Sequence, residues 1–368
     1  MLKQIKIKGY KSLKDQEIDL SRINVLIGPN GGGKSNLISF FKMINFMLSE
    51  NLQLYIARSG GADSLLFYTS KTTLQIESTL TFETDAGFNT HYMRLVHAAQ
   101  DTLIFADERV SFSQKGRPPE TAPKTFFGAG HKESGLINPP ESNDTHRVMQ
   151  RLMNQCRYFQ FHDTSETAGI KQNSYVEDNR YLRSDAGNLA AFLYTLRETA
   201  TPYYDRIISI LRQVMPFFDN FVLERSRFNS NQIMLNWKEK NSDIMMGPHL
   251  LSDGSLRMMA LVSLLFQPEK SLPDVILIDE PELGLHPYAI GILVSLIRYA
   301  SNYTQIIIAT QSAELMDYFE PDEIIITERP EKESFFKRLD SENLREWRED
   351  YSMSELWKKN VIGGSPLQ

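Results

Sequence analysis

The feature that most constrains the fold is the glycine-rich stretch at residues 28–35, which reads Gly-Pro-Asn-Gly-Gly-Gly-Lys-Ser. It satisfies the pattern G-x-x-x-x-G-K-[ST] without adjustment. A predicted strand at 23–27 precedes it, and apolar residues recur at helical spacing from 36 to 48. A loop of this type between a buried strand and a helix surrounds phosphate oxygens with backbone N–H groups and the positive end of a helix dipole. The sequence therefore predicts a nucleotide-binding α/β fold.

Two side chains of this loop have separate tasks in phosphate chemistry. Lys34 is expected to reach the β- and γ-phosphates of ATP, and Ser35 is expected to ligate Mg²⁺. A flexible glycine turn that matches the pattern by chance is the alternative. The flanking strand and helix disfavour that alternative, because they supply the structural context that the motif requires.

A second motif at 274–281 reads Asp-Val-Ile-Leu-Ile-Asp-Glu-Pro. Its short, uniformly apolar run is typical of a parallel strand covered on both faces, and 306–309 has the same character. The strand ends in two adjacent carboxylates, Asp279 and Glu280. We expect Asp279 to hold Mg²⁺ and Glu280 to orient and deprotonate the attacking water. An acidic turn at the surface is the alternative, and the phosphate loop upstream disfavours it.

Between these motifs, residues 251–257 read Leu-Ser-Asp-Gly-Ser-Leu-Arg and open an apolar helix. Taken alone, this is a Ser252 N-cap with a turn glycine. The order phosphate loop, serine-glycine motif and paired carboxylates resembles that of ABC-type ATPases. This resemblance implies that Ser252 and Gly254 of one subunit meet the γ-phosphate of ATP bound to the phosphate loop of another subunit.

The opening residues 5–13, with the strings GPNGGGKSN, LIDEPELGLHP and IIATQS, look like RecF, SMC and OLD-type ATPase heads. The tail at 351–366 is similar to that of stand-alone bacterial RecF-like ATPases. This resemblance implies ATP contacts by Asn30, Gly31, Gly33 and Asn36, and a subunit contact at 282–287. Gln160 could lie where the family places a glutamine that ligates Mg²⁺. Gln311 stands at the γ-phosphate switch, where relatives commonly have histidine, and it cannot carry charge.

The expected fold is one ABC-type ATPase head with a mixed or parallel central sheet. We expect its parts to be arranged as follows: a nucleotide-binding core at 1–50 and 246–330, an inserted antiparallel region at 51–160 with a flexible loop at 113–145, a helical lobe at 161–245, and a docked helical tail at 331–368. In the tail, Ser352 and Glu355 form a predicted capping box, and Leu356 with Trp357 forms an apolar anchor.

Composition limits the partners. A net charge of −6 argues against bulk binding to nucleic acid or membrane, so DNA contact would be local, for example at Lys3, Lys6, Lys8, Lys11 and Lys14. The single cysteine, Cys156, fits a reducing compartment. The N-terminus lacks the apolar core of a signal peptide, and no segment is long enough to span a bilayer. We therefore expect a cytoplasmic protein.

Three functions remain open at this stage. One is the ATPase component of a bacterial anti-phage or toxin-linked system, acting as a dimer or higher oligomer with a separate nuclease or toxin effector. Another is a RecF-like DNA repair ATPase. The last is a weakly hydrolysing or non-hydrolysing nucleotide-dependent scaffold, suggested by Gln311. OLD-type proteins carry a nuclease after the switch strand, but only about 55 residues follow Gln311, too few for a usual domain. We favour the first function.

Overall fold

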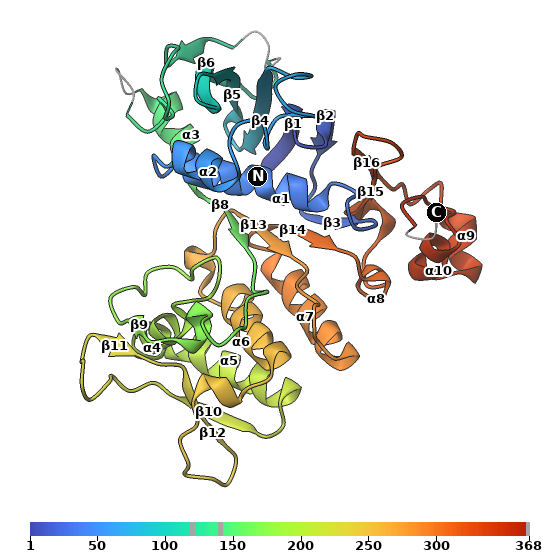
Figure 1. Ribbon diagram of the computed structural model, residues 1–368. Helices are drawn as coiled ribbons and strands as arrows, with labels where there is room; N and C mark the ends of the chain where they lie inside the picture. The colour runs from blue at the N-terminus through green and yellow to red at the C-terminus, as the bar shows by residue number, and fades with distance from the viewer. Residues whose placement is uncertain (118–121, 139–142, 366–368) are drawn as a thin grey trace. The chain divides into compact units, whose positions relative to one another are not determined.

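The computed structural model describes residues 1–117, 122–138 and 143–365 (Figure 1). The chain forms two compact units. The first comprises residues 1–158, 274–277 and 305–368, and the second comprises residues 159–273 and 278–304. Among the described residues, no helix is both long enough and apolar enough to cross a membrane.

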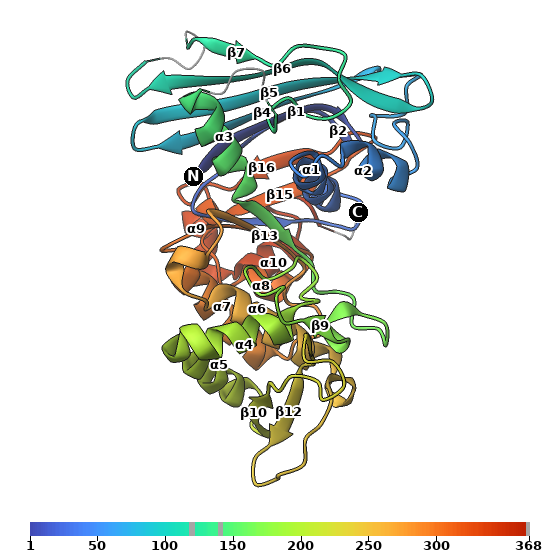
Figure 2. The same cartoon turned by 90° about the vertical axis from the view of Figure 1, so that its left-hand side faces the viewer.

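An antiparallel sheet forms one layer of the first unit, and helices lie under one of its faces (Figure 2). The strand order is β2-β1-β4-β5-β6-β7. Its strands are β1 Leu2–Tyr10, β2 Leu13–Asp19, β4 Gln75–Thr84, β5 Gly87–Ala98, β6 Thr102–Gln114 and β7 Lys124–Phe126. Residues alternate between buried and more exposed positions along β4 and β5, as expected for a sheet with one face on the core.

Three helices cover the buried face of this sheet (Figure 2). They are α1 Lys34–Met47, α2 Leu52–Arg58 and α3 Asp144–Asn154. The rings of Tyr10, Phe40 and Phe41 meet edge to face, with centroids 5.6 and 5.9 Å apart. Such aromatic contacts add to the stabilisation from burial, so the helix after the glycine-rich loop is fixed firmly to β1.

The second sheet has the order β16-β15-β3-β14-β13-β8. Its strands are β3 Ile23–Ile27, β8 Cys156–Phe159, β13 Val275–Asp279, β14 Gln305–Thr310, β15 Ile324–Glu328 and β16 Phe335–Arg338. β3 pairs in parallel with both β14 and β15, whereas β15 and β16 are antiparallel. All residues of β3 and β14 are buried. The predicted mixed α/β fold with a largely parallel core is therefore confirmed.

Four helices dominate the second unit: α4 Leu189–Thr199, α5 Thr201–Val214, α6 Asp253–Leu265 and α7 Pro287–Ala300. Pro202 lies in the first turn of α5, where a missing N–H costs nothing, so the proline starts a helix there. The expected helical lobe at 161–245 also contains strands. β10 Phe218–Val222 pairs with β12 Asn236–Glu239, and β9 Ser174–Tyr175 pairs with β11 Gln232–Ile233.

The structure differs from the flexible loop expected at 113–145. β6 continues to Gln114, and β7 pairs with it. Ser134 and Leu136 are buried. The buried carboxylate of Glu108 holds this segment in place, because it accepts hydrogen bonds from Ser134 Oγ at 2.6 Å and from Gly135 N at 2.8 Å. Residues 118–121 and 139–142 of the expected loop lie outside the described residues.

The C-terminal tail belongs to the first unit. α9 Arg345–Asp350 and α10 Met353–Lys358 lie where the chain ends (Figure 1), and α10 packs on α8 Ala313–Met316. The capping box of Ser352 and Glu355 is present, and Leu356 and Trp357 are buried. The predicted cap and apolar anchor are both confirmed.

Candidate functional site

The glycine-rich loop joins β3 to α1 in the first unit. Gly33 has a φ of 116°, a left-handed conformation that favours glycine, and a Cβ there would lie 2.4 Å from Ser334 Oγ. Asn30, Gly31 and Ser35 are exposed. The loop thus presents its backbone, its asparagine and its serine hydroxyl at the surface, where a phosphate chain can reach them.

Lys34 is buried at the start of α1, and its ammonium group lies inside the curve of the loop. Its Nζ donates to Gly28 O at 2.6 Å and to Pro29 O at 3.0 Å. A buried ammonium needs hydrogen-bond acceptors, and the loop carbonyls supply them. The lysine is therefore held inside the loop that the sequence predicts to bind phosphate.

Asn36, a predicted ATP contact, belongs to a buried polar chain in the structure. Its Nδ2 donates to Ser12 Oγ at 2.6 Å, and Ser12 Oγ lies 2.6 Å from Ser334 Oγ. The asparagine thus ties α1 to the turn after β1 and to the segment before β16. Asn36 thus has a structural role, and its contact with ATP stays a prediction.

The second unit holds the paired carboxylates. Gln160 Nε2 lies 3.2 Å from Asp279 Oδ2 and 3.2 Å from His162 Nδ1. His162 Nε2 donates to the backbone oxygen of Asp279 at 3.0 Å. Gln160 and Asp279, predicted separately, are thus brought together. The sequence reasoning missed His162, although it stands two residues after Gln160 in the same motif.

Glu280 follows Asp279 with a φ of 41°. A non-glycine residue in the left-handed region is uncommon and costs on the order of 1–3 kcal/mol. Such strain persists where the surrounding structure fixes it, and it concentrates at functional sites. The turn therefore directs the glutamate side chain differently from an extended continuation of β13.

The serine-glycine motif starts α6 in the second unit. Ser252 is the N-cap of α6 and accepts from Ser255 N at 3.2 Å, which satisfies one free amide of the first turn. A Cβ at Gly254 would lie 2.4 Å from Gly284 O, so only glycine fits there. A hollow of about 240 Å³ is lined by Ser252, Gly254 and His286 among others. The motif and the loop at 282–287 are thus neighbours.

Arg257 holds this arrangement in place. Its guanidinium donates to Phe161 O at 3.1 Å, to His162 O at 3.0 Å and to Leu283 O at 2.9 Å. One side chain therefore joins α6 to the segment after Gln160 and to the loop after Glu280. The sequence analysis gave Arg257 no role, because its three acceptors are backbone carbonyls that no side-chain pattern reveals.

The remaining predicted residues have simpler environments. Gln311 is exposed directly after β14. His286 is the N-cap of α7 and accepts from Tyr288 N at 3.3 Å. Burial raises the pKa of the Cys156 thiol, which therefore stays protonated and is a poor nucleophile.

The N-terminal lysines considered for DNA contact are largely paired with acids. Four of them lie 3.0–4.0 Å from a carboxylate: Lys3 with Glu83, Lys6 with Glu17, Lys8 with Asp15 and Lys14 with Glu333. Lys11 donates to Ser39 Oγ at 2.9 Å. These contacts reduce the local positive potential that a phosphate backbone would meet.

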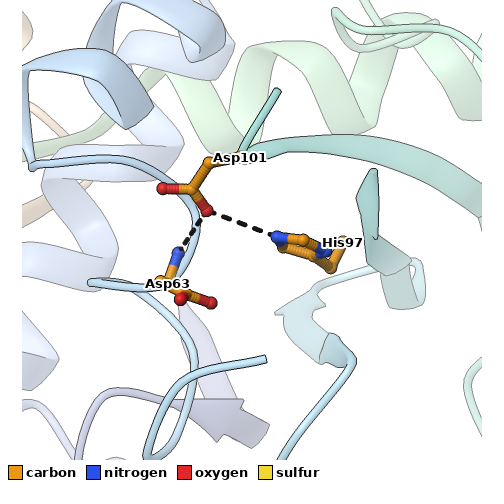
Figure 3. Close-up of side chains that lie close together, drawn as sticks. All are labelled: Asp63, His97 and Asp101. Carbon is orange, nitrogen blue, oxygen red and sulfur yellow. Dashed lines mark hydrogen bonds and ion pairs between the residues drawn. The ribbon is translucent and has the colours of Figure 1, made fainter. Parts of the chain in front are cut away.

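A separate group of ligand-type side chains lies elsewhere in the first unit (Figure 3). Asp63, His97 and Asp101 bring one ligand atom each within 4.8 Å of one another. Both carboxylates already bind loop backbone: Asp101 Oδ1 accepts from Asp63 N at 2.9 Å, and Asp63 Oδ1 accepts from Ser70 N at 2.8 Å. The group therefore ties the segment after α2 to the β5–β6 turn.

Comparison with protein-family models matches residues 23–317 to the family described as "AAA domain, putative AbiEii toxin, Type IV TA system". The chain belongs to this AAA-domain family. No curated protein sequence matches. The matched residues include the glycine-rich loop, the serine-glycine motif and the paired carboxylates, so the three motifs all lie within the AAA-domain region.

Solved structures similar to this AAA-domain chain include heads of SMC proteins. The head called SmcHead, bound to the C-winged helix domain of ScpA, has a TM-score of 0.60 and 16% identity, covering 94% of this chain and 99% of that one. The Smc head with an extended coiled coil, bound to the C-terminal domain of ScpA from Pyrococcus furiosus, has a TM-score of 0.58 and 15% identity, covering 95% of this chain and 98% of that one. The Thermotoga maritima SMC head has a TM-score of 0.50 and 16% identity, covering 92% of this chain and 99% of that one. These similarities establish the ABC/SMC-like ATPase-head fold.

Proposed function

We propose that this chain binds ATP and Mg²⁺ and hydrolyses the ATP, with Glu280 orienting and deprotonating the attacking water. The observation that carries the proposal is the arrangement after β13, where Gln160 and His162 anchor Asp279 and the backbone of Glu280 is held at a φ of 41°. A general base must be fixed in position to take a proton from water. The anchored turn supplies that fixed position.

The phosphate loop and Lys34 supply ATP binding in this proposal. Lys34 exchanges its loop carbonyls for phosphate oxygens, and the exposed loop amides cradle the phosphate chain. For Mg²⁺ we propose the Asp279 carboxylate and the amide oxygen of Gln160 from the second unit and, on the sequence motif, the Ser35 hydroxyl from the first. These hard oxygen ligands suit the ion, which when bound would neutralise charge that develops on the phosphates.

We further propose that two copies close on shared ATP, with Ser252 and Gly254 of one copy meeting the γ-phosphate held by the other. Ser252 caps α6, and the helix N-terminus behind it favours an anion. The neighbouring loop at 282–287, packed against Gly254, would form part of the same subunit contact. Nucleotide binding would then drive dimer closure.

The biological role that we favour is the ATPase component of a toxin-linked or anti-phage system with a separate effector. The family description, which names a putative toxin of a type IV toxin–antitoxin system, supports this role over DNA repair. The ion pairs of the N-terminal lysines also weaken the sequence argument for DNA binding, which rested on their positive charge.

The decisive test is phosphate release from Mg-ATP by the purified wild-type chain, with nucleotide binding measured in parallel. Lys34→Ala is expected to lose both binding and release. Glu346→Ala, an exposed substitution on α9, is the matched control and should change neither. A wild-type chain that binds Mg-ATP without releasing phosphate would contradict hydrolysis and leave the nucleotide-dependent scaffold.

A further inference from the structure

The end of the described chain returns to the strand beside the phosphate loop. After α10, Gly364 N donates to the carboxylate of Glu328, the last residue of β15. Gly364 O accepts from Trp357 Nε1 at 2.7 Å, and both groups are buried. A Cβ at Gly364 would lie 2.6 Å from Ile326 Cγ2, so the turn packs directly against β15. The turn at Gly364 is therefore held by a carboxylate and an indole, in addition to the packing of α10 on α8.

β15 in turn contacts the phosphate loop. Thr327 Oγ1 donates to Ile27 O, the residue before the loop, at 3.2 Å. A Cβ at Gly28 would lie 2.1 Å from Thr327 O, so the first residue of the loop packs on the strand backbone. Gly28 O is also an acceptor of the Lys34 ammonium. One continuous set of contacts thus runs from Gly364 through β15 to the lysine.

A hollow of about 530 Å³ lies between these elements. It is lined by Pro29 and Asn30 of the loop, by Glu328 and Arg329 at the end of β15, and by Gly364 and Ser365 of the tail. The tail thus forms one wall of a space whose other wall is the phosphate loop. A shift of the tail would therefore change the shape of this hollow.

We propose that Glu328 is a positioning residue for nucleotide binding, which couples the docked tail to the phosphate loop. The glutamate keeps the tail turn against β15, and β15 fixes the position of Gly28 and hence of the carbonyls that hold Lys34. Release of the tail loosens the loop and weakens ATP binding. The inference rests on the proposed ATP site.

The test compares Glu328→Ala, Glu328→Gln and the exposed control Glu331→Ala in the full chain. Affinity for ATP is measured at equilibrium, and folding by thermal unfolding without nucleotide. Glu328→Ala should raise the ATP Kd by roughly 10-fold, because it removes the acceptor for Gly364 N and frees the Gly364 turn from the end of β15. Glu328→Gln retains an acceptor oxygen and should restore binding to within about 2-fold of wild type.

A fluorescence readout separates positioning from general damage. Trp237→Phe and Trp347→Phe leave Trp357 as the only tryptophan of the chain. Its emission should change when ATP binds, and Lys34→Ala should abolish that change. In Glu328→Ala the emission should shift towards that of an exposed indole before ATP is added.

The outcomes are distinguishable. A wild-type chain that binds no ATP contradicts the proposed function itself. A Glu328→Ala chain with an exposed Trp357 and a wild-type Kd overturns the coupling. If Glu328→Ala does not fold, Trp357→Phe removes the other hydrogen bond to Gly364, together with part of the buried ring. An unchanged ATP Kd in that folded variant also overturns the coupling.

Discussion

Gln160 Nε2 lies 3.2 Å from Asp279 Oδ2 in the second unit, although the two residues are 119 positions apart in sequence. The amide nitrogen donates to Asp279 and His162, and the amide oxygen is the atom of Gln160 that could ligate a metal. The contact therefore fixes both the orientation of the amide and the direction of the carboxylate.

Gln160→Ala should weaken Mg²⁺ binding, because Asp279 loses its orienting donor and the site loses a possible oxygen ligand. Loss of such a supporting partner typically costs about 10- to 100-fold in metal affinity, and we expect the Mg²⁺ needed for half-maximal ATP turnover to rise by that factor. Gln172→Ala, an exposed change in the same unit, is the control. An unchanged Mg²⁺ dependence would remove Gln160 from the metal site.

Glu280→Gln should retain ATP affinity and lose on the order of 10²- to 10⁴-fold in turnover, because glutamine cannot accept the proton of the attacking water. Steady-state phosphate release and equilibrium ATP binding measure the two effects separately. The substitution preserves the size of the side chain at a φ of 41°. A turnover number equal to that of wild type would exclude Glu280 as the base.

Mixed dimers test the shared site. Lys34→Ala and Ser252→Arg should each be nearly inactive alone, whereas a dimer of the two has one site with both lesions and one with neither. Free exchange should restore roughly a quarter of wild-type activity if the two sites work independently. Ser252→Thr, which keeps the N-cap hydroxyl, controls for loss of the helix cap. Tagged subunits verify the exchange. If verified mixed dimers gave no recovery although one occupied site suffices in wild type, the shared-site model would be wrong.

Glu108→Ala should destabilise the first unit. The carboxylate is fully buried, lies 3.1 Å from His91 Nε2 and accepts from Ser134 and Gly135. Removing one partner of a buried polar group of this kind costs about 3 kcal/mol, measured as the free energy of unfolding in denaturant. Glu77→Ala on the same sheet, a less buried carboxylate, should cost clearly less. Equal losses in the free energy of unfolding for the two variants would show that the burial of Glu108 contributes nothing extra to stability.

Chelation distinguishes a loop tie from a cation site at the Asp63, His97 and Asp101 group. If it is a loop tie, EDTA leaves the melting temperature unchanged. Asp101→Asn then keeps an acceptor for Asp63 N, and Asp101→Ala costs about 1 kcal/mol of stability. A chelator that lowered the melting temperature of wild type but not of Asp101→Asn would instead identify a bound cation.

The sequence predicted most of what positions the site. The loop glycines, the apolar runs of β3, β13 and β14, and the tail cap are local signals, and local signals survive folding unchanged. Glu108 could not be predicted, because a single glutamate in an alternating strand gives no sign that a distant loop will cover it. Arg257 and the anchoring of Asp279 by His162 escaped for a different reason, because their partners are backbone atoms that no side-chain pattern reveals.

The order of the central sheet also bears on how the protein is made. Ile27 precedes the phosphate loop, yet Thr327, which donates to its carbonyl, is 300 residues later. At ribosomal speeds of about 5–20 residues per second, β3 waits roughly 15 to 60 s for its neighbour β15. During that interval β3, which is apolar apart from Asn24, lacks both of its neighbours in the sheet, β14 and β15. The nascent chain thus presents an aggregation-prone segment, and we expect its yield in the cell to depend on chaperones that shield the N-terminal half until synthesis ends.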